Sequence, residues 1–166
     1  MKFKHILLVE DDPRDEELTL TALEGSNLAD KVFVAHDGEE ALDYLYCRGK
    51  YDARPGGNPV AVLLDLKMPK VSGIEVLKII KADDKLRMIP IVVLTSSREE
   101  PDLMECYEYG VNAYVVKPVD FGEFVQAVKQ LGVFWAATNE PPPQIWRRDF
   151  SPARADASPF ATTGAK

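Results

Sequence analysis

The segment VAVLLDLKMP, residues 60–69, begins with five consecutive apolar residues and then reaches a carboxylate, Asp65. A short run rich in valine and leucine is typical of a strand buried on both faces, as in a parallel sheet. Pro69 ends regular pairing because proline has no N–H to donate. We therefore predict that Asp65 lies at the C-terminal tip of a central strand, in the crevice where open parallel sheets bind ligands. Taken alone, the segment is equally compatible with Asp65 simply opening a turn.

The length and composition are those of one folded domain. The chain has 166 residues, 46% of them hydrophobic, and a net charge of -7, which argues against a nucleic-acid-binding surface. Its two cysteines, Cys47 and Cys106, fall in predicted helices outside any CxxC motif, so we expect a reducing cytoplasm and no structural zinc. The sequence shows neither a signal peptide nor an apolar run long enough for a membrane span, and we expect a cytoplasmic protein.

Strand and helix signals alternate along the chain. Apolar runs predict strands at residues 5–9, 32–35, 60–64, 90–94 and 113–116. Helices are predicted to follow them, beginning near Asp12, Asp37, Ser72, Pro101 and Asp120. A loop is expected at 47–58. The last helix carries an apolar stripe that we assign to the core, made of Phe121, Phe124, Val125, Val128, Leu131 and Trp135.

This alternation predicts a doubly wound α/β domain with right-handed crossovers, a five-stranded parallel sheet with five flanking helices. For its strands we expect the flavodoxin-like order 2-1-3-4-5. We expect that domain to span residues 1–135. Beyond it, the composition shifts: Pro141-Pro142-Pro143 indicates an extended arm over residues 136–150. Residues 151–166 are rich in Ala, Ser, Pro and Thr and are predicted to be disordered.

Polar residues of matched chemistry stand at the ends of four predicted strands. They are Glu10 and Asp11, Asp65, Thr95, and Lys117. In a parallel sheet these side chains gather at one edge, where three carboxylates resist full ionisation unless a cation lies among them. Mg²⁺ suits such oxygen ligands. Asp65 would then be a nucleophile that forms an acyl phosphate, with Lys117 and the metal neutralising the transferring oxygens.

Together these residues resemble a response-regulator receiver domain of bacterial two-component signalling. The resemblance covers roughly residues 2–131 and rests on four motifs: LLVEDD (7–12), LDLKMP (64–69) with Gly73, LTS (94–96) and YVVKP (114–118). It implies a Mg²⁺-dependent signalling switch that accepts phosphate from a histidine kinase. Such a protein promotes only its own phosphotransfer and dephosphorylation, so we do not expect an enzyme with a separate substrate.

The resemblance also implies a role for each matching residue. Asp65 would accept the phosphoryl group, Thr95 and Lys117 would bind its oxygens, and Tyr114 would be the aromatic switch. The metal ligands would be Glu10, Asp11, Asp65 and the backbone carbonyl of Lys67. The acid pair is Glu-Asp here instead of Asp-Asp, a variant within the family pattern.

Two departures from a minimal receiver narrow the resemblance. The long loop before the third strand and the segment from Leu131 through Pro143 look like single-domain receivers that partner phytochrome-type histidine kinases. Phe134, Trp135 and Trp146 add apolar surface at the C-terminal end, which packs either on its own domain or on a second copy. We expect a homodimer formed through this arm.

Other classes fit less well. A haloacid-dehalogenase-type phosphatase needs a second acid two residues after the nucleophile, where Lys67 stands. The chain has no GxxxxGK[ST] motif of a P-loop NTPase, and an acid-lined crevice would repel a flavin phosphate. A degenerate receiver that is folded but not phosphorylated stays open as an alternative.

Overall fold

The computed structural model describes residues 4–26, 28, 31–55 and 57–143. Within them, the strands are β1 (Ile6–Val9), β2 (Val32–Ala35), β3 (Ala61–Leu64), β4 (Ile91–Thr95) and β5 (Ala113–Val116). The α-helices are α1 (Pro13–Glu24), α2 (Gly38–Leu45), α3 (Gly73–Ala82), α4 (Glu100–Glu108) and α5 (Phe121–Val133). Two short helical segments complete the described chain, the 3₁₀ helix η2 (Gly49–Tyr51) and the π-helical η3 (Phe134–Thr138).

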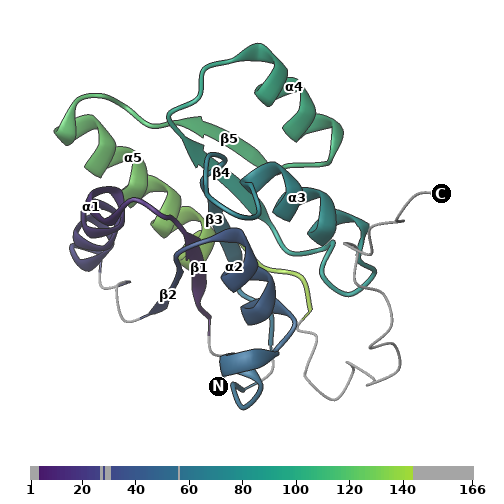
Figure 1. Ribbon diagram of the computed structural model, residues 1–166. Coiled ribbons are helices and arrows are strands. Elements are labelled where there is room, and N and C mark those ends of the chain that lie inside the picture. Colours follow the sequence, from purple (N-terminus) through teal and green to yellow (C-terminus); the bar gives the residue numbers. More distant parts are fainter. Residues whose placement is uncertain (1–3, 27, 29–30, 56, 144–166) are drawn as a thin grey trace.

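The strands of this described part form one five-stranded parallel sheet in the order β2-β1-β3-β4-β5. In Figure 1, α1 and α5 lie on one face of the sheet, and α2, α3 and α4 cover the other. Alternate strand residues point to the two faces, so that Leu7 and Leu64 join one core while Leu8 and Leu63 join the second. The predicted doubly wound fold and strand order are confirmed.

The helix starts follow the capping residues that the sequence predicts. Asp12 accepts hydrogen bonds from the amides of Arg14 and Asp15 at 2.8 and 3.2 Å. Ser72 and Glu75 form the reciprocal capping box at the start of α3. Such caps satisfy amides that have no partner inside the helix and thereby fix where each helix begins.

Three local predictions are corrected. Phe121 is 60% exposed instead of buried, because the first turn of α5 projects beyond the core that the rest of the helix covers. Cys47 lies just after α2, in a left-handed conformation with φ 52°, and not in a helix. The segment predicted as a loop at 47–58 contains η2. None of the described helices is long and apolar enough to cross a bilayer.

The C-terminal end of the described chain packs against its own domain. The helical run passes residue 135, the expected domain end, and continues to Thr138. Ala136 is buried and Trp135 packs on the core beneath α1 and α5. Farther on, the three prolines Pro141–Pro143 line a small pocket together with Asn58 and Met88. The residues predicted to be disordered, 151–166, and the end of the predicted arm, 144–150, lie outside the described residues.

Candidate functional site

Strand register brings the predicted site residues to one edge of the sheet. Val9 of β1 pairs with Leu64 of β3, so the next residues along the two strands, Glu10 and Asp65, emerge side by side. The amide of Asp65 donates to the Val9 carbonyl oxygen at 3.1 Å. On the other side, the amide of Lys117 donates to the Thr95 carbonyl oxygen at 2.7 Å. Backbone pairing therefore sets the position of each residue that carries a site side chain.

The turn after β3 is fitted tightly against the start of α3. The Gly73 amide donates to the Leu66 carbonyl oxygen at 2.9 Å, and a Cβ at Gly73 would lie only 2.1 Å from the Asp65 carbonyl oxygen. Lys70 adopts a left-handed conformation with φ 63° within this turn. The Asp65 carboxylate accepts a hydrogen bond from the Leu66 amide at 2.8 Å, which orients it. A glycine is required at position 73 because any side chain would displace the backbone of Asp65.

Three carboxylates meet at this edge: Glu10, Asp11 and Asp65 each offer an oxygen, and these oxygens lie within 4.8 Å of one another. Glu10 and Asp65 are buried, and Asp11 is the more exposed member. Burial raises the pKa of Asp65 and raises that of Glu10 to about 7, against the opposing effect of the Lys117 ammonium. An all-oxygen donor set with surplus negative charge fits a hard divalent cation.

Lys117 supplies a cation from the protein itself. Its Nζ lies 2.7 Å from Glu10 Oε2, 2.6 Å from Asp15 Oδ2 and 3.8 Å from Asp65 Oδ2. Burial alone would lower the pKa of Lys117, but its hydrogen bonds to Asp15 and Glu10 outweigh burial and raise it. The raised pKa of Glu10 favours a protonated carboxyl, whereas that of Lys117 favours an ion pair. Because both contacts of the Lys117 ammonium are as short as charge-assisted hydrogen bonds, Glu10 and Lys117 form an ion pair.

Sequence reasoning missed Asp15. It stands in the first turn of α1, where an acid is expected simply because it complements the helix dipole. Its contact with Lys117 joins residues 102 positions apart, and it depends on how α1 packs beside α5. The only available signal was its place three residues after the capping Asp12.

Thr95 and Tyr114 are linked through the loop that leads into α4. The Ser97 amide donates to Thr95 Oγ1 at 3.3 Å, and the Tyr114 hydroxyl donates to the Ser97 carbonyl oxygen at 3.1 Å. The Ser97 hydroxyl in turn donates to Asp102 in the first turn of α4 at 2.5 Å. Thr95 is fully buried and Tyr114 is half-buried. A shift of the Thr95 hydroxyl would therefore reach both the aromatic ring and α4.

Lys67, the remaining predicted residue, lies in the turn between Asp65 and Gly73. Its side chain is exposed and makes a loose ion pair with Glu99 at 3.9 Å. The predicted ligand is its backbone carbonyl, which belongs to the same turn as the carboxylate cluster. The structure therefore brings Glu10, Asp11, Asp65, Thr95 and Lys117 to one edge of the sheet. Tyr114 stands within β5, opposite Val93, and its hydroxyl reaches the Ser97 carbonyl oxygen.

The arrangement is chemically suited to phosphoryl transfer onto a carboxylate. Asp65 is a buried carboxylate, the acid trio provides a place for a divalent cation, and Thr95 and Lys117 offer a hydroxyl and an ammonium. Transfer of a phosphoryl group depends chiefly on positioning and on stabilising the charge of its oxygens. The site holds groups that can position a phosphoryl group and groups that can stabilise the charge of its oxygens.

Known proteins carry the same pattern. The family model described as the response regulator receiver domain matches residues 6–129. The response regulator Rcp1 of Synechocystis is 38% identical over 135 residues, covering 81% of this chain and 90% of Rcp1. A probable methanogenesis regulatory protein, FilR2 of Methanothrix harundinacea, is 40% identical over 139 residues, covering 82% of this chain and 86% of FilR2.

Solved structures agree with these relatives. The bacteriophytochrome response regulator AtBRR is 63% identical with a TM-score of 0.68, covering 84% of this chain and all (100%) of that one. The phosphorylated cyanobacterial phytochrome response regulator RcpA is 39% identical, with a TM-score of 0.78 and coverage of 84% and 99%. The Mn²⁺-bound form of Rcp1 is 37% identical, with the same score and coverage. On the strength of the family match and of relatives that align over most of their length, this chain belongs to the response regulator receiver domain family and is a phosphorylation-activated signalling switch, similar to the phytochrome response regulator RcpA and to Rcp1.

Proposed function

We propose that Asp65 is the phosphoryl acceptor of this switch. The observation that carries the proposal is the position of Asp65, a buried carboxylate at the end of central strand β3 with Lys117 Nζ at 3.8 Å. Glu10 and Asp11 stand beside it within the acid trio. Glu10 also follows a strand beside these groups, but it is held in a hydrogen bond to Lys117 at 2.7 Å, whereas Asp65 follows the central strand β3 and has the Thr95 hydroxyl as a further partner.

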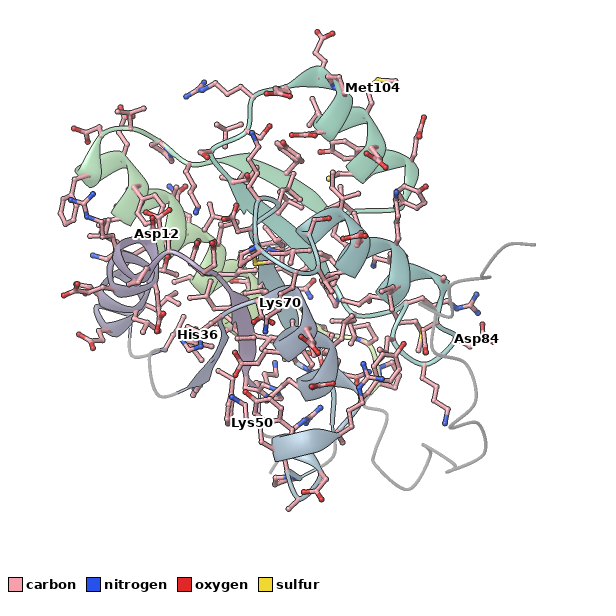
Figure 2. All side chains as sticks on the ribbon, in the orientation of Figure 1. Asp12, His36, Lys50, Lys70, Asp84 and Met104 are labelled. Atoms are coloured by element: carbon pink, nitrogen blue, oxygen red, sulfur yellow. The ribbon has the colours of Figure 1, made fainter. Side chains whose placement is uncertain are left out.

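Labelling of the Asp65→Asn variant tests this assignment. The amide cannot form an acyl phosphate but has nearly the same shape, so we expect a folded protein that acetyl phosphate or a kinase no longer labels. The control is Asp84→Asn, the same change at an acid whose side chain is 93% exposed and which lies on the far side of the molecule from Asp12 in Figure 2. Full labelling of Asp65→Asn would end the proposal.

The cation of this site is proposed to be Mg²⁺. Receiver domains bind a divalent metal, and the acid trio has the oxygen chemistry for a hard one. When bound, the ion supplies positive charge that stabilises the transferring oxygens. Glu10, Asp11, Asp65 and the carbonyl of Lys67 would hold it. Asp11→Ala should abolish Mg²⁺-dependent labelling while Glu17→Ala, at an exposed acid of α1, should not. Undiminished labelling in excess EDTA would contradict this requirement.

The upstream partner is proposed to be a phytochrome-type histidine kinase. The proposal is supported by the 63% identity to the bacteriophytochrome response regulator AtBRR, well above the 40% identity to FilR2. Phosphotransfer rates from a phytochrome-type kinase and from an unrelated histidine kinase should differ by at least about tenfold, which corresponds to ~1.4 kcal/mol of discrimination. Equal rates from both kinases would argue against this partner.

We also propose that the protein works as a homodimer through its C-terminal part. Val133 and Phe134 are 45% and 47% exposed at the end of α5, although Trp135 packs inward. Phe134 makes an edge-to-face contact with Trp135, with ring centroids 5.0 Å apart, and adds exposed apolar surface of the type that favours association. The mass of the full chain in solution tests this proposal, and the truncations that locate the contact are argued below.

A further inference from the structure

The shortest contact of the site lysine is with an acid outside the predicted donor set. Lys117 Nζ lies 2.6 Å from Asp15 Oδ2, compared with 2.7 Å from Glu10 Oε2 and 3.8 Å from Asp65 Oδ2. The first two are hydrogen bonds, whereas the third distance is too long for one. The ammonium therefore sits toward α1 and away from the acceptor carboxylate.

Both ends of this contact are anchored by the backbone. Asp15 stands in the first turn of α1, where its own amide donates to the capping carboxylate of Asp12 at 3.2 Å. Lys117 follows β5, and its amide donates to the Thr95 carbonyl oxygen at 2.7 Å. The lysine side chain is 8% exposed and that of Asp15 is 32% exposed. The ammonium will therefore stay with Asp15 unless another group attracts it more strongly.

A phosphoryl group on Asp65 would provide that attraction and would also compete with Asp15. An ammonium has three N–H donors, and Glu10 and Asp15 already use two of them. A phosphorylated side chain carries a charge of roughly -1.5 to -2 near neutral pH. The phosphoryl oxygens and the Asp15 carboxylate would thus share one cation while repelling each other.

We propose that Asp15 is a positioning residue that holds the Lys117 ammonium back from Asp65 and thereby weakens the grip of the site on a phosphoryl group. The inference rests on the proposed role of Asp65 as acceptor. Through Asp15, α1 would therefore influence both the rate at which Asp65 is phosphorylated and the lifetime of the acyl phosphate.

Beryllofluoride, a phosphoryl analogue, tests the proposal with the full chain and Mg²⁺. Asp15→Asn keeps the shape and removes the charge, so the bound ¹⁹F signal should appear at roughly three- to tenfold lower beryllofluoride concentration than in the natural protein. Asp15→Glu retains a carboxylate and should return toward the natural affinity. The matched control is Glu17→Gln, the same charge change at an exposed residue of α1.

A second readout needs neither metal nor phosphoryl analogue. The ¹³Cε resonance of Lys117 should shift in Asp15→Asn and stay in place in Glu17→Gln, because of these two acids of α1 Asp15 is the one that contacts the ammonium. The affinity difference between Asp15→Asn and the natural protein should also shrink between low and high salt, since Asp15 is partly exposed. A change that merely loosened α1 would produce neither effect. Asp15→Ser serves as a second neutral variant should Asp15→Asn unfold.

The outcomes separate this inference from the proposed function. If the natural protein binds no beryllofluoride, or if Asp65→Asn binds it equally well, the acceptor assignment fails. If the natural protein binds it but Asp15→Asn matches Glu17→Gln, the positioning role of Asp15 is wrong. Weaker binding by Asp15→Asn would also overturn it, because Asp15 would then support the lysine instead of holding it back.

Discussion

Single residues decide whether the proposed acceptor site can form, and Gly73 is the strictest case. A Cβ added there would lie 2.1 Å from the Asp65 carbonyl oxygen and 2.7 Å from Leu66 Cα. These are backbone atoms of the acceptor segment, which cannot yield without moving Asp65. The sequence shows a glycine before a helix, but the reason for it is a contact across the turn that only the folded chain reveals.

We therefore predict that Gly73→Ala damages both fold and function. Overpacking of this kind costs roughly 1–3 kcal/mol of the free energy of unfolding, and displacement of Asp65 should greatly slow labelling by acetyl phosphate. Urea unfolding and the labelling rate are the two measurements. Gly122→Ala is the control, since a Cβ there meets only a side-chain oxygen of Asp120, at 3.2 Å. Natural stability and labelling in Gly73→Ala would show that the turn is more adaptable than its geometry indicates.

The residue scale also shows what sequence patterns can and cannot predict. Glu10, Asp65, Thr95 and Lys117 were predictable, because strand ends in a parallel sheet must meet at one edge. Asp15 was not, because its contact with Lys117 depends on how α1 packs and no local pattern encodes it. Helical spacing likewise placed Phe121 in the core, although its turn of α5 extends past the sheet. Helical periodicity predicts on which face of a helix a residue lies. It does not predict whether the neighbouring sheet reaches far enough to cover that residue.

At the scale of elements, β4, β5 and α4 are joined by a short chain of hydrogen bonds. Ser97 links the Thr95 hydroxyl, the Tyr114 hydroxyl and Asp102. Moving a two-state equilibrium from mostly inactive to mostly active takes about 5.5 kcal/mol of differential interaction. Charge-assisted hydrogen bonds of ~1.5–3 kcal/mol each can supply it if several form together.

Thr95→Ala should separate phosphorylation from response. The acceptor and the metal ligands are retained, so we expect labelling by acetyl phosphate to persist. The phosphorylation-dependent conformational change at α4 and β5 should be lost, because the variant lacks the hydroxyl that is linked through Ser97 to Tyr114. Hydrogen exchange of α4, with and without phosphate, measures the response. Ser96→Ala, which removes a neighbouring exposed hydroxyl, is the control. A natural phosphorylation-dependent change in Thr95→Ala would disprove this coupling.

A second set of contacts fastens the segment after α2 to the helix itself. Glu40 of α2 accepts hydrogen bonds from the His36 amide at 2.8 Å, from the Tyr51 hydroxyl at 2.7 Å and from Lys50 of η2. Figure 2 shows His36 and Lys50 near each other at the lower left of the molecule. Burial alone would raise the pKa of Glu40, but these donors outweigh burial and lower it to about 2.

Glu40→Gln tests this fastening through its pH dependence. Because the folded-state pKa is depressed, the contribution of Glu40 is present above its ordinary pKa of 4.5 and is lost as the pH falls through about 2. We expect Glu40→Gln to lower the free energy of unfolding by roughly 1–2 kcal/mol at pH 7, with the deficit vanishing toward pH 2. Glu39→Gln, at a side chain that is 60% exposed, is the control. A deficit independent of pH would mean that packing, not charge, holds η2.

At the scale of the whole molecule, the alternation of strands and helices was enough to predict a parallel sheet with helices on both faces, because right-handed crossovers leave few alternatives. Alternation alone does not set the strand order, since doubly wound sheets have two common ones, and the order 2-1-3-4-5 was expected from the resemblance to receiver domains. The course of the chain after α5 was not predictable. The apolar residues at its end suit packing on the same domain or on another copy equally well. Within a few residues the structure shows one apolar residue packed on its own domain, the buried Ala136, and one left exposed, Phe134.

Two truncations should locate the dimer contact. Removal of residues 133–166 takes away Ala136 and Trp135, which cover the core beneath α1 and α5, and we expect a loss of roughly 2–4 kcal/mol of unfolding free energy. Removal of residues 144–166 leaves that packing and the proline contacts intact, so thermal unfolding should be unchanged.

If the arm beyond Pro143 carries the dimer, light scattering should then give a dimer mass for the full chain and a monomer mass for the 1–143 chain, both able to accept phosphate. A dimer of the 1–143 chain would place the contact on the exposed Val133 and Phe134 instead. A full chain that stays monomeric with and without phosphate would remove assembly from the mechanism.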